Sequence, residues 1–372
     1  MQNNSPAASR DEERYYARSR EGRDLVRQNN LDSLRLLFAA MVALYHAAFL
    51  SAAPALAPLL RWTNPGIAVD GFFVISGYLI FQSYDKSRSL ADYAAKRARR
   101  ILPAYVVVIV VIGLVGALIT VLPVQAYFGL GLFKYLATNL AFFNFLAPTP
   151  PGVFLQNPVP AADGALWTIK VEVTFYLSVP LLAWLLRRSP KPVVLLSLYL
   201  LSYAYYVVLS YASERTARPI YDLLAKQLPG QLSFFSAGAA IYYFRPLFMY
   251  WRWPLMILGL LIVIVLPFWL NIGPLYPAAL AMAVMGIAFG PYLGNAGKFG
   301  DLSYGLYIWH FPVLQLLVLS GLFRSNPWNA LAIGMALAMS MAFLSWHLVE
   351  KRFLKRSSHY RQVEDAIPAI ER

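Results

Sequence analysis

The feature that most constrains this chain is a series of apolar stretches, each close to the length of a helix that crosses a bilayer. Such a helix needs about 20 mostly apolar residues. The chain has 372 residues, of which 59% are hydrophobic and 13% charged, whereas a soluble chain carries roughly 25% charged residues. A soluble fold of this length cannot cover so much apolar surface. The sequence therefore predicts an all-α integral membrane protein.

Apolar runs and the breaks between them predict about ten transmembrane helices. The predicted spans are 31–50, 69–84, 101–122, 166–186, 192–211, 229–244, 254–271, 275–293, 302–322 and 329–349.

The positions of Lys and Arg predict the orientation of these spans. With the N-terminus in the cytoplasm, 24 of the 32 basic residues fall in inner loops and tails and 6 in outer segments. Inner loops are enriched in Lys and Arg in membrane proteins. Both termini are therefore expected in the cytoplasm. The chain has a net charge of +14. Its basic residues alternate with apolar spans, as in a topology signal, so no nucleic-acid partner is expected.

Three segments lie outside this scheme. Residues 127–146 are apolar enough to cross, yet a crossing there would place Arg187 and Arg188 outside, so we expect an interfacial or re-entrant helix on the outer face. Residues 1–30 are expected to be a polar, Arg-rich cytoplasmic arm without a cleavable signal peptide. Residues 31–355 then form the transmembrane domain, and 356–372 a cytoplasmic C-terminal tail.

Ionisable residues inside spans are costly and mark functional sites. Arg35 and His46 are eleven residues apart, which returns a helix almost to its starting face with a rise of roughly 16 Å. They are therefore expected to face the same side of one helix, Arg35 near the cytoplasm and His46 in the outer half. The predicted outer layer contains His46, Asp70, Lys170 and Glu172, and Glu172 has Tyr176 as its i,i+4 neighbour.

A histidine beside carboxylates can be oriented as a general base requires, which makes His46 the candidate base with Asp70 or Glu172 as its partner. Plainer readings stay open: His46 as a structural hydrogen-bonding residue, KRARR at 96–100 as a topology anchor, Ser76 as a small packing residue, and SYGLYIWH as an interfacial aromatic belt. The predicted inner layer contains Arg35, Arg97, Arg99, Arg100, Tyr304, His310, His347 and Glu350.

Other catalytic signatures are missing from the sequence. It contains no G-x-x-x-x-G-K-[ST] loop, no H-E-x-x-H and no G-x-S-x-G, and it has no cysteine and four histidines. These motifs carry nucleotide, zinc and serine-hydrolase chemistry. We expect no metal site and no permanently bound cofactor.

Six ordered motifs resemble the membrane-bound acyltransferase family 3. They are LDSLRLLFAAMVALYHA with Arg35 and His46, AVDGFFVISGYLI, KRARRILPAY, LWTIKVEVTFYLSVP with Trp167, SYGLYIWHFPV and HLVEKRF. The resemblance covers roughly residues 31–355, and the Arg-to-His spacing and the W-x-x-x-x-E-x-x-F-Y run are its most specific parts.

The resemblance implies a membrane O-acyltransferase that moves an acyl group, often acetyl, from cytoplasmic acyl-coenzyme A to a hydroxyl of a cell-envelope or exported glycan or glycolipid, in the inner membrane of a bacterium. It implies that His46 leads catalysis, that Glu172 is the family's acidic residue, and that Arg35, Arg97 and Arg100 bind the donor. The residue pattern itself adds Asp70 to the expected catalytic residues. Ser76, Trp167, Tyr176, Tyr304 and His310 become supporting residues. Relatives commonly carry Ser or Pro where Lys170 stands, and its role is open.

Two other function classes remain. A transporter or flippase would use the buried ionisable residues as a substrate or proton pathway. A non-catalytic assembly subunit would tolerate replacement of His46.

Overall fold

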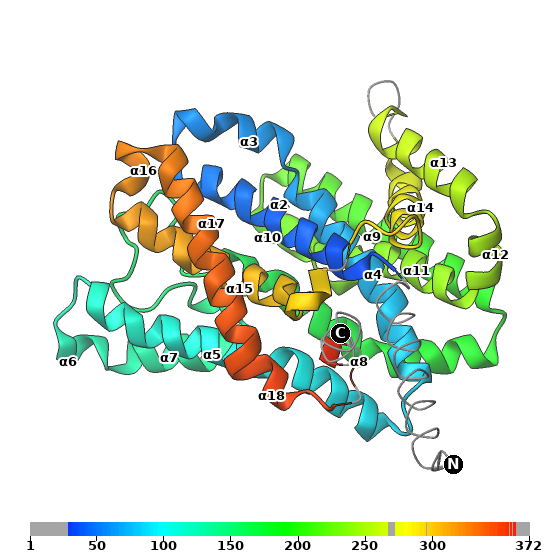
Figure 1. The fold of residues 1–372 in the computed structure, drawn as a ribbon, viewed down its shortest axis with the longest axis horizontal. Helices are drawn as coiled ribbons and strands as arrows, with labels where there is room; N and C mark the ends of the chain where they lie inside the picture. The colour runs from blue at the N-terminus through cyan, green and yellow to red at the C-terminus, as the bar shows by residue number, and fades with distance from the viewer. Residues whose placement is uncertain (1–28, 267–271, 295, 357, 359, 362–372) are drawn as a thin grey trace, which may run out of the picture.

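The computed structural model describes residues 29–266, 272–294, 296–356, 358, 360 and 361. Helices make up nearly all the regular structure, and no β-strand occurs within these ranges (Figure 1). The predicted all-α class is confirmed. The N-terminal arm and most of the C-terminal tail lie outside the described residues.

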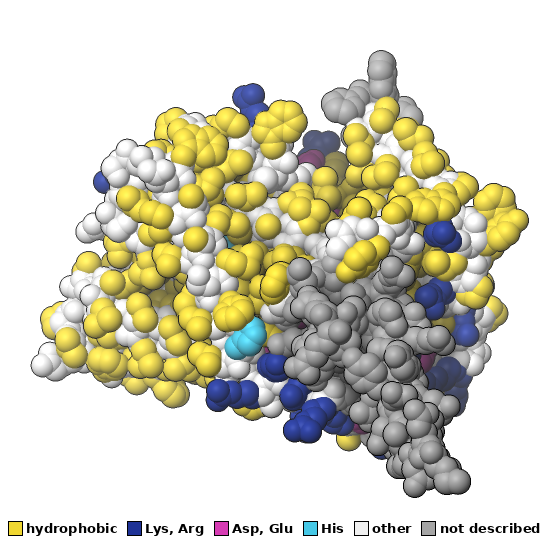
Figure 2. Space-filling model, viewed as in Figure 1, with side chains coloured by type: hydrophobic (Ala, Val, Ile, Leu, Met, Phe, Trp, Pro, Cys, Tyr) yellow, Lys and Arg dark blue, Asp and Glu magenta, His cyan; other side chains and the backbone are white. Residues whose placement is uncertain are grey.

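Seven segments are long and apolar enough to cross a membrane. Each contains one main helix, in the order α2 (Leu31–Ser51), α4 (Pro65–Asp85), α5 (Leu90–Ile119), α8 (Trp167–Arg188), α9 (Lys191–Thr216), α15 (Leu302–Leu319) and α17 (Pro327–Leu344). Hydrophobic side chains cover most of the face in Figure 2, while Lys and Arg gather mainly along its lower and right-hand edges. This distribution is typical of a protein that faces lipid.

Three further predicted spans form helices that are shorter than expected. They are α11 (Leu228–Tyr243), α13 (Arg252–Ile264) and α14 (Tyr276–Ala288), of 16, 13 and 13 residues. A helix of 13 residues is about 20 Å long, which is less than the roughly 30 Å of a hydrocarbon core. All ten predicted helices therefore exist, but seven have the length and composition of a span. The end of the predicted span 254–271 lies outside the described residues.

The segment predicted at the outer face is broken into short pieces. Residues 127–146 contain the end of α6 (Val124–Tyr127), α7 (Leu130–Leu140) and the 3-10 turn η2 (Asn144–Leu146). Gly113 of α5 lies against the side chains of Leu132 and Leu136, so α7 packs along the second half of α5. Its 11 residues reach only about 16 Å, too short for a crossing.

Helix α15 lies at the centre of the molecule. In its most apolar window 78% of the residues are buried, against 11% in α9, so α15 is enclosed by protein whereas α9 is at the periphery. Glycines allow other helices to approach closely: a Cβ atom on Gly77 of α4 would overlap the carbonyl oxygen of Phe235, and one on Gly238 of α11 would overlap that of Val74. Small residues at such crossings are typical of membrane helix packing.

Candidate active site

Helices α2 and α15 run parallel and present polar residues to each other at two levels. At one end, Arg35 of α2 donates a hydrogen bond to Asp301, the residue that precedes α15, over 2.8 Å. At the other end, His46 of α2 meets His310 of α15. The prediction that Arg35 and His46 share one helix face is confirmed, and the helix that they face is α15.

The two imidazole rings are in direct contact. His46 Nδ1 lies 2.8 Å from His310 Nε2, and the ring centroids are 5.1 Å apart with an interplanar angle of 11°. Phe311 contacts His46 edge-on at 5.1 Å. His310 is completely buried, whereas His46 is partly exposed.

The expected position of His310 in the inner layer was wrong. It is the ninth residue of α15, and a rise of 1.5 Å per residue carries it about 12 Å along the helix, to the level of His46. The prediction assigned His310 to the inner layer because its motif begins at the inner end of the span, and it did not allow for the distance that eight residues of helix cover.

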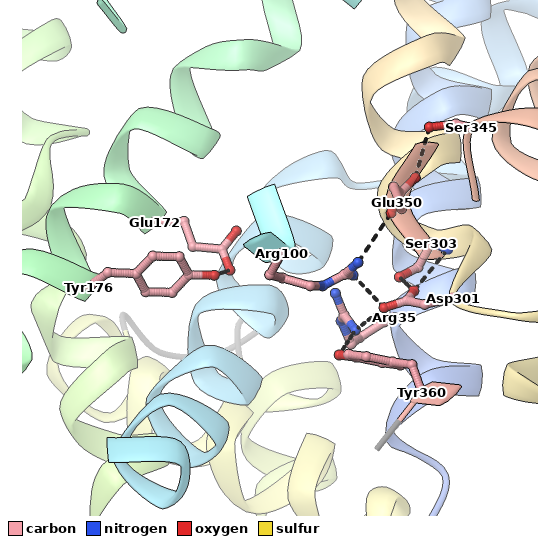
Figure 3. A network of polar contacts seen from close by, with 9 residues as sticks. All are labelled: Arg35, Arg100, Glu172, Tyr176, Asp301, Ser303, Ser345, Glu350 and Tyr360. Atoms are coloured by element: carbon pink, nitrogen blue, oxygen red, sulfur yellow. Dashed lines mark hydrogen bonds and ion pairs between the residues drawn. The ribbon is translucent and has the colours of Figure 1, made fainter. Parts of the chain in front are cut away.

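A buried charged network surrounds Asp301 (Figure 3). Its Oδ2 atom accepts from Arg35 and from Arg100 of α5, and its Oδ1 atom accepts from the Ser303 hydroxyl and backbone N–H. Burial alone would raise the pKa of the Asp301 carboxyl, but the guanidinium groups of Arg100 and Arg35 hold it well below its usual range. Asp301 is therefore a carboxylate that two arginines share.

Glu350 extends this network from the far end of α17. There the helix widens into a π-helical turn, Ser345–Glu350, and such turns are frequent at functional sites. Arg100 donates to Glu350 over 3.2 Å, and the Ser345 hydroxyl donates to the other carboxylate oxygen over 2.8 Å. Arg100 is thus enclosed by two carboxylates.

Tyr360, in the predicted tail, packs onto the same arginines. Arg35 donates to the Tyr360 hydroxyl over 2.7 Å, and the Arg100 guanidinium lies 4.8 Å from the Tyr360 ring centroid. Burial raises the pKa of Tyr360, so its hydroxyl is neutral at physiological pH.

A small cavity, which we call the inner cavity, lies beside this network. Its lining residues are Arg35, Val69, Phe72, Phe73, Ser76, Thr168, Ile169, Glu172, Ser303, Tyr304 and Tyr307. Tyr176 donates to Glu172 over 2.6 Å, as Figure 3 shows. Glu172 thus shares the cavity with Arg35, and in the described part of the chain no hydrogen bond joins it to His46. The expected partnership of Glu172 with His46 is therefore not formed, and its depth within the span stays a prediction.

A much larger hollow, the basic vestibule, opens at the end of the molecule where Lys and Arg gather. Its basic lining residues are Lys86, Lys96, Arg97, Arg99, Arg100, Arg245 and Lys355. Arg97 donates to the Ser83 hydroxyl over 2.9 Å, its guanidinium lies 5.6 Å from the Tyr176 ring centroid, and no carboxylate pairs with it among the described residues. Arg97 is therefore available to an anion, unlike Arg100.

The vestibule, the inner cavity and the histidine pair follow one another along α2. Arg100 lines the vestibule and Arg35 the inner cavity, and both bind Asp301, so the charged network is the wall between the two hollows. Tyr307 lines the inner cavity at its other end and its ring centroid is 5.9 Å from that of His310. One aromatic layer thus separates the cavity from the pair.

The remaining predicted residues have other surroundings. Asp70 accepts a hydrogen bond from Tyr276 of α14 over 3.3 Å, and no hydrogen bond joins it to His46 within the described ranges. Lys170 lies over the Phe145 ring at 5.3 Å. Tyr304 donates to the Ile101 carbonyl over 3.0 Å and supports the Arg100 guanidinium from 5.2 Å. Trp167 is the half-buried first residue of α8.

Sequence reasoning missed Asp301, the centre of the network. One signal was available: Asp301 stands directly before an apolar run and caps its helix by accepting from the Ser303 N–H, a position at which Asp is favoured. Over the residues that the structure describes, no cluster of three or more His, Cys, Asp or Glu side chains has the arrangement of a metal site.

The fold and the site define a multi-pass α-helical membrane protein whose interior holds a paired histidine and a shared carboxylate, next to a basic hollow. The family model for an acyltransferase domain, the acyltransferase 3 type, matches residues 28–348. The chain belongs to this family, and it is a membrane O-acyltransferase.

Three relatives are similar over most of this chain. The chain is 28% identical over 343 residues to the O-acetyl transferase of Shigella phage Sf6, covering 89% of this chain and 98% of the relative. It is 27% identical to nodulation protein 10 of Rhizobium leguminosarum bv. viciae, covering 88% and 94%. It is 26% identical to the peptidoglycan O-acetyltransferase OatA of Listeria monocytogenes, covering 86% of this chain and 55% of OatA. No solved structure matches the chain.

Proposed function

We propose that this protein transfers an acetyl group from acetyl-coenzyme A in the cytoplasm to a hydroxyl of a cell-envelope glycan or glycolipid, in the inner membrane of a bacterium. The observation that carries the proposal is the order of groups along α2 and α15. Arg35 lies at the inner cavity next to the basic vestibule, and His46 lies at the other end against His310. A donor bound at one end and a base at the other suit transfer across a membrane.

The basic vestibule supports a donor with phosphate groups. Guanidinium groups bind phosphate with a planar fork of donors, and Arg97 has no carboxylate partner among the described residues. With the termini in the cytoplasm, as the charge distribution predicts, the vestibule opens to the side where coenzyme A esters occur. The thin arm of the donor would pass the Arg35–Asp301–Arg100 wall into the inner cavity.

His46 would act as the general base. It would take the proton of the acceptor hydroxyl while that oxygen attacks the thioester carbonyl carbon. A C–O bond forms, the C–S bond breaks, and the proton held on His46 passes to the departing thiolate. Base catalysis of this kind contributes about 10²- to 10⁴-fold. Glu172 and Asp70 remain proposed catalytic residues. Glu172 would act from the inner cavity, and Asp70 from the position where Tyr276 donates a hydrogen bond to it.

The relatives support the choice of group and acceptor. Two of them are named O-acetyl transferases, and one of these is a peptidoglycan O-acetyltransferase. An acetyl donor and a glycan hydroxyl are therefore the first pair to test.

The test uses the purified chain in vesicles, with labelled acetyl-coenzyme A outside and glycan extracted from the source cells as acceptor. Label should appear in the glycan as an alkali-labile ester with the wild type, and fall at least hundredfold with His46→Gln. The matched control is His347→Gln, a histidine on the π-helical turn that lines neither hollow.

Two results would refute the proposal. Acetylation at the wild-type rate by His46→Gln would remove the base. Movement of glycan across the vesicle without any labelled product would favour a flippase instead.

A further inference from the structure

We infer that His310 is a positioning residue that fixes the tautomer of His46, so that the Nε2 atom of His46 is the proton acceptor. The argument begins at the carbonyl oxygen of Leu306, which lies 3.1 Å from His310 Nδ1. A carbonyl oxygen only accepts hydrogen bonds. The Nδ1 atom of His310 must therefore carry the hydrogen.

The tautomer of His310 determines that of His46. A neutral imidazole has one donor and one acceptor nitrogen, so His310 Nε2 is an acceptor. It lies 2.8 Å from His46 Nδ1, which must then donate. The only nitrogen left with a free lone pair in this chain of hydrogen bonds is the Nε2 atom of His46.

The surroundings exclude the opposite arrangement, in which a cationic His310 donates to His46. His310 is completely buried, its ring contacts are Tyr307 and Phe311, and no carboxylate pairs with either ring among the described residues. A buried charge without a partner is costly. Two neutral rings joined by one hydrogen bond carry no such cost.

This arrangement gives the two histidines different roles. His46 is partly exposed and His310 is not, so only His46 can touch a substrate. His310 holds the His46 ring in place and accepts from the imidazolium that forms when Nε2 takes a proton, the task of the third residue in a nucleophile–base–acid triad. In this catalytic sense the inference rests on the proposed function, but the tautomer itself does not.

The first test reads the tautomer directly and needs no activity. The full chain, labelled with ¹⁵N-histidine, is studied by NMR in lipid nanodiscs, and the ring signals of its four histidines are assigned with His46→Gln, His310→Gln and His347→Gln. We expect a protonated Nδ1 and an unprotonated Nε2 for both His46 and His310. A protonated Nε2 on His46 would overturn the inference, whether or not the protein acetylates glycans.

The second test compares two replacements of His310. In His310→Gln the side-chain oxygen reaches about as far as Nε2 and can still accept from His46. In His310→Met the acceptor is lost at similar volume. We expect His310→Gln to keep at least tenfold more kcat than His310→Met, with an unchanged KM for the donor, and His46 to show mixed tautomers only in His310→Met.

The outcomes separate this inference from the proposed function. Equal kcat values for the two variants, with the wild-type His46 tautomer retained in His310→Met, would leave His310 a packing residue. A wild type that acetylates nothing yet shows the expected tautomers would refute the proposed function and leave the positioning of His46 intact.

Discussion

Arg35 and Asp301 are 266 positions apart in the sequence and form a buried ion pair of 2.8 Å. The same carboxylate oxygen also accepts from Arg100, so one negative charge holds α2, α5 and the start of α15 together. Removing one member of a buried pair leaves uncompensated charge and costs about 3–5 kcal/mol.

Asp301→Asn is therefore expected to lower the free energy of unfolding by about 3–5 kcal/mol, measured by thermal unfolding in detergent. The control is Asp222→Asn, which breaks an exposed ion pair with Lys226 and should cost less than about 1 kcal/mol. Equal effects of the two substitutions would mean that the network around Asp301 is not a stabilising centre.

The same carboxylate predicts a loss of stability in acid. Because the two arginines lower the pKa of Asp301, its stabilising contribution is complete above the ordinary aspartate value of about 3.9 and is lost as the pH falls below it. The wild-type melting temperature should drop more steeply below about pH 4 than that of Asp301→Asn. Parallel curves would assign the acid transition to other groups.

Arg97 and Arg100 should behave differently when each is replaced. Arg97→Gln removes a charged donor that no carboxylate neutralises among the described residues, so the KM for acetyl-coenzyme A should rise about 10- to 100-fold, the loss of one charged hydrogen bond of roughly 1.5–3 kcal/mol. The KM for the glycan should not change, and the melting temperature should fall less than in Arg100→Gln, because Arg97 loses a hydrogen bond to Ser83 and a contact with the Tyr176 ring but no ion pair.

Arg100→Gln serves as the comparison, because Arg100 is enclosed by Asp301 and Glu350. This variant should lose stability before any donor effect can be measured. An unchanged donor KM in Arg97→Gln would support the reading of KRARR as a topology anchor.

Glu172 can be tested apart from its hydrogen-bond donor. Tyr176→Phe removes one bond of 2.6 Å to the carboxylate and should reduce kcat by about tenfold, because the charge remains in the inner cavity. Glu172→Gln removes the charge that faces Arg35 and should reduce kcat more than a hundredfold if Glu172 is catalytic. Equal losses would show that the pair acts only as a structural unit.

The sequence predicted the parts of this site that depend on one helix alone. The spacing of Arg35 and His46 defines a common face because helical geometry is local, and the apolar runs locate ten helices for the same reason. Partners from other helices could not be predicted in this way. His310 meets His46 only because α2 and α15 lie side by side, and which helices become neighbours depends on the packing of the whole chain.

Asp301 shows a second limit of sequence reasoning. It stands one residue outside the apolar run of α15, so a search for ionisable residues inside spans passes over it, although it carries the charge that organises the interior. The depth assigned to His310 was wrong for a related reason. Depth along a span depends on where each helix begins and on the reach of long side chains, and neither follows from the hydropathy pattern.

Asp163 allows a second test of how stability depends on pH, at the turn before α8. It precedes the turn Gly164–Leu166, one carboxylate oxygen accepts from the Ala165 N–H over 3.0 Å, and the other has no hydrogen-bond partner among the described residues. Burial raises the pKa of Asp163 well above its ordinary value. The folded state therefore holds this proton more tightly than the unfolded state, and folding loses stability as the pH rises above about 3.9 toward the folded-state pKa.

Asp163→Asn keeps the accepting oxygen and cannot ionise. Its free energy of unfolding should match that of the wild type near pH 4 and exceed it increasingly toward neutral pH, by about 1.4 kcal/mol for each pH unit between the ordinary aspartate value and the folded-state pKa, and its melting temperature should rise in parallel. Burial raises the pKa of nearby Tyr135 well above 10, so this tyrosine stays neutral over the range. Asp222→Asn should show no such trend. A lower stability of Asp163→Asn than of the wild type at every pH would contradict this expectation. It would mean that the second carboxylate oxygen of Asp163 binds a partner such as an ordered water, and that the native state holds the ionised carboxylate.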